Sequence, residues 1–141
     1  MRKEKHIEAL LGLLKDVQKE PSPAVVGFIY STALTHMFHL AFYDHIDPGR
    51  AIKHEGFRSK KKSEALKQLI PDFEDKDKLF LEWQDMENKR NALCYGHPEK
   101  EDIESYIGSY FLIKNILEKQ AGFSFEVTQL ENLLPEEKKD E

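Results

Sequence analysis

The segment RNALCYGHPE, residues 90–99, places close together an arginine and a histidine, two residue types that can take part in chemistry. Arg90 follows Trp83 by seven residues and Met86 by four, which places its guanidinium on the apolar face of a helix. An imidazole changes charge near neutral pH, which suits acid–base chemistry. Arg90 and His97 are therefore candidate functional residues, with His97 as the candidate acid or base.

Both residues also have interpretations that involve no chemistry. A buried arginine is unfavourable unless it is paired, so Arg90 could instead reach past the helix end or pair with a carboxylate of the next helix. Gly96 allows a left-handed exit from the helix, and Pro98 favours an extended conformation at His97. We therefore expect His97 at a corner between two helices, within side-chain reach of Arg90. The alternative for His97 is a cap at the start of the next helix.

Apolar spacing predicts that an all-α fold positions these side chains. Residues recurring at i, i+3, i+4 and i+7 predict four long helices, at about residues 3–19, 23–46, 75–95 and 98–120. A shorter helix is predicted between the second and the third, with Pro71 as its stop. Its inward side chains are expected to be Ala65, Leu66, Leu69 and Ile70. The predicted fold is an up-and-down four-helix bundle with this extra short helix.

One domain is expected to account for most of the chain. A length of 141 residues suits a single domain, which we expect to span residues 1–122. Gly122 is a suitable cap for the last long helix. Residues 123–141 are expected to form a tail that begins with a short alternating piece and ends in an acidic, partly mobile stretch.

Composition limits the classes of function. The net charge of −5 argues against a protein that coats nucleic acid with a basic surface, although not against a local basic patch. Cys94 is the only cysteine, so one chain can form neither a disulfide nor a cysteine-based zinc site. A reducing compartment, and hence a cytoplasmic location, is expected. The sequence shows no signal-peptide pattern.

The second predicted helix has an uncharged polar face. A membrane-spanning helix needs about 20 predominantly apolar residues, so this helix is interpreted as the central helix of a soluble bundle without membrane contact. Solvated faces usually carry charge, and an uncharged one suggests a homodimer interface or a cleft wall. The expected interface residues are Thr35, His36, His39 and Tyr43. The alternative is a face whose polar groups are satisfied beneath the short helix.

A metal site on this helix is not expected. His36 and His39 are spaced like a pair of ligands, but no suitably placed carboxylate accompanies them on the helix. We expect no metal and no cofactor.

A basic run before and within the short helix could gather RNA phosphates. The expected contacts are Arg58, Lys60, Lys61 and Lys62. The alternative is a solvated, charged loop. Tyr95 could stack on a nucleobase or cover the corner between two helices.

The arrangement of Arg90 and Asn91, followed after a short interval by His97, resembles the signature of the HEPN superfamily. That signature is an arginine, usually followed by a polar residue, with a histidine a few residues later. Here it falls at the junction of the last two long helices of a predicted all-α bundle. The resemblance covers about residues 22–120.

The resemblance implies a metal-independent endoribonuclease that serves as a toxin or defence component. Such proteins act as homodimers, with the two Arg/His motifs facing each other in a cleft at the interface. By resemblance, Arg90 would hold the scissile phosphate and stabilise the transition state. His97 would move a proton of the 2′-hydroxyl or of the leaving oxygen, and Asn91 would orient the phosphate or the histidine.

Two alternatives to catalysis stay open. Some members of the superfamily bind a nucleotide without catalysis or pair with a nucleotidyltransferase-type partner protein. The chain could also be a helical adaptor in which the motif is a coincidence.

Overall fold

The computed structural model describes residues 2–19, 22–46 and 60–134, and every regular element within them is helical. The prediction of an all-α bundle is confirmed. The elements are α1 (Lys3–Lys19), α2 (Pro23–Ala41), the short 3₁₀ helix η1 (Tyr43–His45), α4 (Lys60–Leu69), α5 (Lys76–Tyr95), α6 (Lys100–Ala121) and α7 (Val127–Leu133). No helix in these ranges combines the length and the apolar character needed to cross a bilayer.

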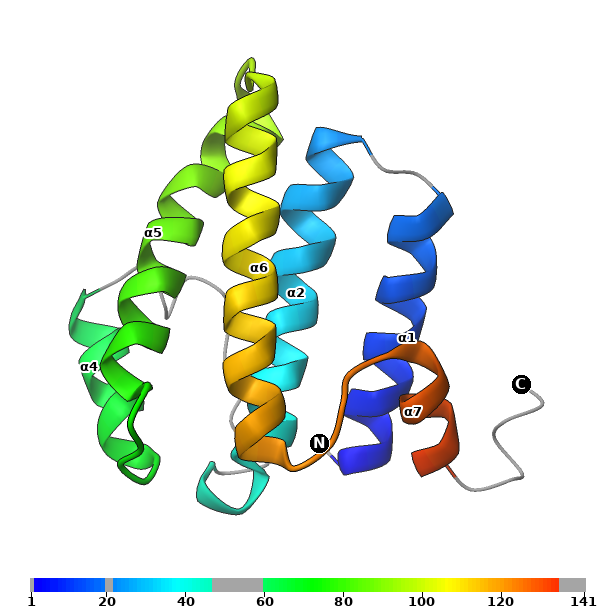
Figure 1. Cartoon of the computed structure of the whole chain (residues 1–141), viewed down its shortest axis with the longest axis vertical. Coiled ribbons are helices and arrows are strands. Elements are labelled where there is room, and N and C mark those ends of the chain that lie inside the picture. The colour runs from blue at the N-terminus through cyan, green and yellow to red at the C-terminus, as the bar shows by residue number, and fades with distance from the viewer. Residues whose placement is uncertain (1, 20–21, 47–59, 135–141) are drawn as a thin grey trace.

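The long helices α1, α2, α5 and α6 run alternately up and down in Figure 1. Helix α2 occupies the middle of the bundle, because it packs against α1 on one side and against both α5 and α6 on the other. The prediction that this segment forms the central helix is therefore confirmed.

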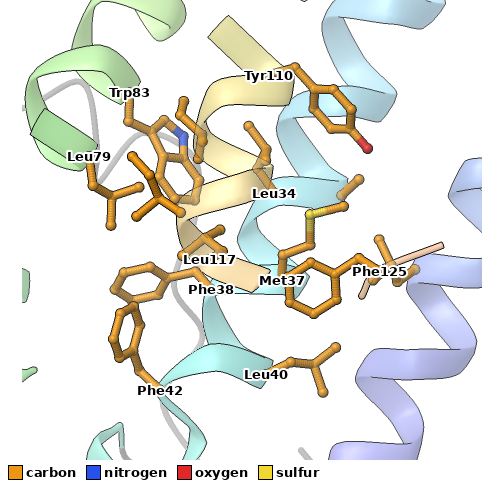
Figure 2. Close-up of a cluster of buried hydrophobic side chains, with 14 of the residues drawn as sticks. Leu34, Met37, Phe38, Leu40, Phe42, Leu79, Trp83, Tyr110, Leu117 and Phe125 are labelled. Carbon is orange, nitrogen blue, oxygen red and sulfur yellow. The ribbon is translucent and has the colours of Figure 1, made fainter. Parts of the chain in front are cut away.

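The core forms where α2 meets α5 and α6, as Figure 2 shows. Phe38 of α2 contacts the ring of Trp83 edge-to-face at 5.8 Å and that of Phe80 at 6.2 Å. Phe38, Trp83 and Tyr106 of α6 are fully buried. Because burial of each large apolar side chain contributes about 1.5–3 kcal/mol, this cluster fixes how α5 and α6 sit on α2.

The helix ends differ from those predicted. The second helix stops at Ala41, and η1 follows it, instead of one helix continuing to residue 46. Gly96 is extended, with φ −107° and ψ −157°, so the predicted left-handed exit is wrong. Helix α6 begins at Lys100, two residues after Pro98, because the side chain of Asp102 accepts a hydrogen bond from the Glu99 backbone N–H at 2.9 Å.

The segment after Gly122 packs onto the helical bundle. Gly122 has the left-handed conformation expected of a cap, with φ 82°, and the chain folds back so that α7 lies against α1. Phe125 and Leu130 are fully buried, and Leu134 is 7% exposed. The predicted alternating piece forms no strand and is followed by α7. The domain boundary at residue 122 stays a prediction. Residues 135–141 lie outside the described part of the chain.

The short helix α4 faces inward with a different set of residues from those expected. Leu66 and Ile70 are buried as predicted, but Ala65 is exposed and Leu69 is 42% exposed. The fully buried Ser63 completes the inward face instead. The spacing Ser63, Leu66, Ile70 is the i, i+3, i+7 stripe of a helix resting on α5 along a narrow line.

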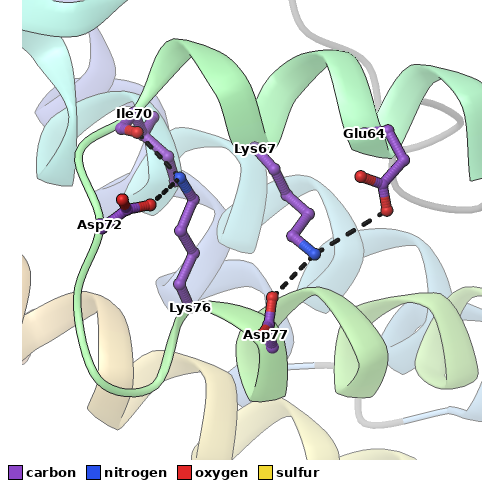
Figure 3. A network of polar contacts seen from close by, with 6 residues as sticks. All are labelled: Glu64, Lys67, Ile70, Asp72, Lys76 and Asp77. Atoms are coloured by element: carbon purple, nitrogen blue, oxygen red, sulfur yellow. Dashed lines mark hydrogen bonds and ion pairs between the residues drawn. The ribbon is translucent and has the colours of Figure 1, made fainter.

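Polar contacts join α4 to the start of α5, as Figure 3 shows. Lys67 pairs with Asp77 at 2.8 Å, and Lys76 donates to the carbonyl of Ile70 at 2.9 Å and pairs with Asp72 at 3.1 Å. The hydrogen bond from Lys67 lowers the pKa of Asp77. The carboxylates of both ion pairs are solvent-exposed, so these pairs add little stability.

Gly27 marks the closest approach of α2 to α5. A Cβ added at Gly27 would lie 2.7 Å from Cys94 Sγ and 3.4 Å from Leu93 Cβ. The carbonyl of Gly27 also accepts a hydrogen bond from the Tyr106 hydroxyl at 2.9 Å. The absence of a side chain here lets α2, α5 and α6 meet at one point.

We expect Gly27→Ala to destabilise the fold by about 1–3 kcal/mol, because the added methyl group overpacks the contact with Cys94. Adding Cys94→Ala removes the sulfur that clashes and should recover most of the stability. Gly12→Ala is the matched control, since nothing lies within 4 Å of its added Cβ. It should be neutral or stabilising by up to about 1 kcal/mol through helix propensity. Urea unfolding measures all four proteins, and equal effects at Gly27 and Gly12 would contradict the close approach.

Candidate functional site

Arg90 is buried on the inward side of α5, as its spacing predicted. Its exposed fraction is 8%, and the neighbouring stripe residues Met86 and Leu93 are buried with it. The guanidinium carbon lies 4.7 Å from the centre of the Phe28 ring on α2. Nε of Arg90 is buried and has no hydrogen-bond partner within the described residues. Nor does any carboxylate of residues 2–19, 22–46 or 60–134 form an ion pair with Arg90.

A buried carboxylate lies one helical turn before Arg90. Glu87 is 2% exposed and accepts a hydrogen bond from the Ser31 hydroxyl of α2 at 2.6 Å. Burial raises the pKa of Tyr106, and the charge of Glu87 raises it further while that of Arg90 lowers it. Burial also raises the pKa of the Cys94 thiol, an effect that Arg90 partly offsets. The opposite charges of Glu87 and Arg90 therefore act on the same small buried volume.

His97 lies outside this volume. It is exposed, in the link between the end of α5 at Tyr95 and the Glu99 cap of α6. Glu99, not His97, is the N-cap residue, so the capping interpretation of His97 is wrong. In the described part of the chain, no hydrogen bond or ion pair connects His97 with Arg90. Asn91 is exposed as well.

The structure does not gather the predicted motif into a closed site within one chain. It places the arginine inside and both Asn91 and His97 on the surface of the corner between α5 and α6. Any chemistry that uses all three side chains requires an open cleft at this corner.

Phe28 is a residue of this region that the sequence interpretation missed. It is 41% exposed, and its ring meets that of Tyr95 edge-to-face at 6.0 Å, with an angle of 89° between the planes. Tyr95 itself is 74% exposed. A signal was present in the sequence, because Phe28 precedes Ser31 and Thr32 by three and four residues and so shares the uncharged polar face of its helix.

Helix α1 of the same chain contacts three of the four residues expected to form a homodimer interface, namely His36 and His39 of α2 and Tyr43 of η1. His6 Nδ1 of α1 lies 2.9 Å from His36 Nδ1, and the His6 ring stacks on that of His39 at 4.5 Å. Lys3 lies 5.2 Å from the centre of the Tyr43 ring. Thr35 donates a hydrogen bond to the Thr32 carbonyl at 2.6 Å.

These contacts explain the uncharged face without a second copy of the chain. The alternative expectation is that the polar groups of this face find partners within the chain, beneath the short helix. His36 and His39 do find such a partner, but it is His6 of α1 and not the short helix. A homodimer stays a prediction, and so does its interface at Thr35, His36, His39 and Tyr43.

The basic run lies away from the Arg90 corner. Lys60, Lys61 and Lys62 are exposed in the first turn of α4. Helix α4 lies beside the half of α5 opposite Tyr95 (Figure 1). Arg58 falls outside the described residues. One chain therefore does not bring the lysines next to His97.

Comparisons with family models, with curated proteins and with solved structures yield no match to this chain. Within residues 2–19, 22–46 and 60–134, no group of three or more His, Cys, Asp or Glu side chains is arranged to hold a metal ion. The function is therefore argued from the side chains themselves.

The three histidines between α1 and α2 predict a pH-dependent stability. Burial, followed by the charges of His39 and His36, lowers the pKa of His6 to about 4, and burial and His36 lower that of His39 to about 4. Burial also lowers the pKa of His36. Because Nδ1 of His6 and Nδ1 of His36 are 2.9 Å apart, one must accept a proton that the other donates, and both cannot be protonated there.

We expect the free energy of unfolding to fall as the pH falls from about 6.5 towards 4. The unfolded chain binds protons at the ordinary histidine value of 6.5, whereas the folded chain does so only near 4. Between pH 7 and pH 5.5 the decrease should be on the order of 1–2 kcal/mol. Urea midpoints at both pH values measure it, and His6→Gln should flatten the dependence. His45→Gln, at an exposed histidine, should behave like the wild type, and equal pH dependence in both variants would refute the histidine cluster as its cause.

Proposed function

We propose that this chain is a HEPN-type endoribonuclease that cleaves RNA without a metal, through Arg90 and His97, as a toxin or defence component in the cytoplasm. The observation that carries the proposal is the burial of Arg90 without a hydrogen-bond partner for its Nε. This cation is only 8% exposed, lies against the Phe28 ring and has an Nε donor without a partner among the described residues. Such a group is costly to a fold, and a bound phosphate oxygen would satisfy it.

The sequence pattern supports the same assignment from a different direction. Arg90, the polar Asn91 and His97 stand at the corner of the last two long helices of an all-α bundle, where the HEPN motif is expected. His97 is exposed and so is accessible to a substrate. Because His97 and Asn91 are exposed, the proposed site would be open to solvent and not an enclosed pocket.

The reaction needs one nucleophile and two proton transfers. The 2′-hydroxyl of the RNA attacks the adjacent phosphorus while a base removes its proton, and the 5′-oxygen of the next nucleotide leaves with a proton from an acid. His97 fills one of these two roles, and Arg90 stabilises the extra negative charge on the pentacoordinate phosphorus. Asn91 orients the phosphate or the imidazole. The products are a 2′,3′-cyclic phosphate end and a free 5′-hydroxyl.

A homodimer accounts for the incomplete geometry within one chain. If two copies place their Arg90 corners face to face, the cleft contains two arginines and two histidines, and one copy can supply the acid while the other supplies the base. Each chain then needs no direct contact between its own Arg90 and His97. Lys60, Lys61 and Lys62 would hold more distant phosphates of the same RNA.

A second candidate function is nucleotide binding without catalysis, including as one half of a pair with a nucleotidyltransferase-type protein. It is favoured by the lack of a direct contact between Arg90 and His97 in the described chain. A nucleotide would still satisfy the buried guanidinium.

We expect RNA cleavage by the purified protein in EDTA, with a decrease of about 10²–10⁴-fold in rate on His97→Ala and about 10²–10³-fold on Arg90→Ala. Arg90→Lys keeps the charge but removes the Nε donor and should also be slower. His45→Ala, at an exposed histidine in η1, is the matched control and should keep full activity. A time course with end-labelled RNA and analysis of the product ends measures the rates and the cyclic phosphate.

Circular dichroism must first show that each variant is folded, because removal of Arg90 takes a cation away from the buried carboxylate of Glu87. Equal cleavage by the wild type, His97→Ala and Arg90→Ala would assign the activity to a contaminant and contradict the proposal. Nucleotide binding by the wild type without any cleavage would establish the second candidate instead.

We expect charge reversal of Lys60, Lys61 and Lys62 to glutamate to weaken RNA binding and to flatten its salt dependence. Removing one lysine–phosphate interaction should reduce the slope of log affinity against log salt by roughly 0.7 on a single strand. Reversal of Lys15, Lys78 and Lys119, which are also exposed, changes the net charge equally and serves as the control. Identical slopes for the two triple variants would show that Lys60, Lys61 and Lys62 do not contact RNA phosphates.

A further inference from the structure

Phe28 of α2 and Tyr95 of α5 form a corner of two exposed aromatic rings. The rings stand at 89° to each other with their centres 6.0 Å apart, and 41% of Phe28 and 74% of Tyr95 are exposed. We call this pair the aromatic corner. Exposed aromatic residues are ordinary on protein surfaces. The pair therefore indicates a binding site only in combination with the residue beneath it.

Beneath the aromatic corner lies the guanidinium of Arg90. Its carbon is 4.7 Å from the centre of the Phe28 ring, and its buried Nε has no partner within the described residues. A cation–π contact offsets only part of the cost of burying a cation. Glu87, one helical turn away, accepts a hydrogen bond from Ser31, and Arg90 Nε is left without an acceptor among the described residues. Arg90 Nε therefore still lacks a hydrogen-bond acceptor, and an anionic oxygen that passes the edge of Phe28 could supply one.

An aromatic surface beside a buried phosphate-binding donor matches the two parts of a nucleotide. The base offers a flat face that stacks on an aromatic ring, and the phosphate offers acceptor oxygens one ribose away. Phe28 does not close the path, because partly exposed side chains exchange rotamers on the picosecond to nanosecond scale. Gly27 is what brings these groups together, since its missing side chain lets α2 approach Cys94 next to Tyr95.

We propose that the aromatic corner and Arg90 together bind one unpaired nucleobase and its neighbouring phosphate in single-stranded RNA. The base stacks on the open face of Tyr95 and against Phe28, and the phosphate accepts the Nε–H of Arg90. A base inside a duplex is already stacked and cannot do this, so the occupant is single-stranded. The choice of RNA over a free nucleotide rests on the proposed ribonuclease function, whereas the stacking itself does not.

The test measures binding without cleavage. A fluorescent single-stranded oligonucleotide with 2′-O-methyl ribose at every position lacks the nucleophilic hydroxyl, so its binding to the full chain can be followed by anisotropy. We expect Tyr95→Leu to bind roughly tenfold more weakly, in keeping with the usual contribution of base–aromatic stacking. Tyr95→Phe keeps the ring and should bind like the wild type. Phe28→Leu should also weaken binding.

A matched control is available at Phe111 of α6. Phe111 is 47% exposed, packs edge-to-face on Tyr110 at 5.1 Å and has Lys114 Nζ at 5.9 Å from its ring. It therefore reproduces an exposed aromatic ring near a cation at another place, and Phe111→Leu should leave binding unchanged. Equal affinities of Tyr95→Leu and the wild type, or an equal weakening by Phe111→Leu, would overturn the proposal.

An abasic oligonucleotide and a free nucleotide separate the remaining outcomes. Removing the bases should weaken binding to the wild type but should not weaken binding to Tyr95→Leu any further, because that variant already lacks the stacking ring. If AMP binds in a Tyr95-dependent manner and the oligonucleotide does not, the occupant is a free nucleotide and single-stranded RNA is excluded. If binding depends on Tyr95 but unmodified RNA of the same sequence is never cleaved, the inference holds and the ribonuclease proposal fails. If Tyr95→Leu changes neither binding nor cleavage, the ribonuclease proposal stands and the base-stacking site is overturned.

Discussion

The central constraint on this molecule is that α2 is covered on several sides by the other helices, so its polar groups must find partners inside the chain. An unsatisfied buried polar group costs about 1–3 kcal/mol, which is a large share of the stability of a small domain. Ser31 meets Glu87 of α5, His36 and His39 meet His6 of α1, and the carbonyl of Gly27 meets the hydroxyl of Tyr106. Each of these partners fixes the position of a different neighbouring helix.

This requirement places two charges in the interior beside each other. Glu87 is drawn inward as the acceptor for Ser31, and Arg90 lies one turn later on the same side of α5. A nearby opposite charge lowers the cost of burying each group. Even so, Arg90 Nε has no acceptor among the described residues. Departures from complete hydrogen bonding are rare in a well-packed core and tend to occur where a protein binds something. The site and the central helix are therefore two consequences of one packing arrangement.

The parts of the fold that depend on local sequence could be predicted, and the parts that depend on distant partners could not. The burial of Arg90 followed from its spacing to Trp83 and Met86, and the left-handed Gly122 from its position after a helix. Helix α7 was missed because the preceding residues FSFEV suggest alternation only briefly, and α7 packs against α1, which is distant in the sequence. His6 as the partner of His36, thirty positions away, leaves no mark in the sequence of either helix.

Under the proposed ribonuclease function, Glu87 and Arg90 would together affect which state of a phosphate is bound. The buried carboxylate of Glu87 lies one helical turn from Arg90 and would oppose the approach of an anion. A phosphodiester with one negative charge would gain a hydrogen bond from Arg90 Nε but would meet that opposition, so ground-state binding would be modest. The pentacoordinate transition state would carry a second negative charge on the oxygens next to Arg90, and a charge-assisted hydrogen bond strengthens as the acceptor becomes more negative. Because the contact to Arg90 would be direct and the one to Glu87 would not, the gain would exceed the added repulsion, and the arrangement would favour the transition state over the substrate.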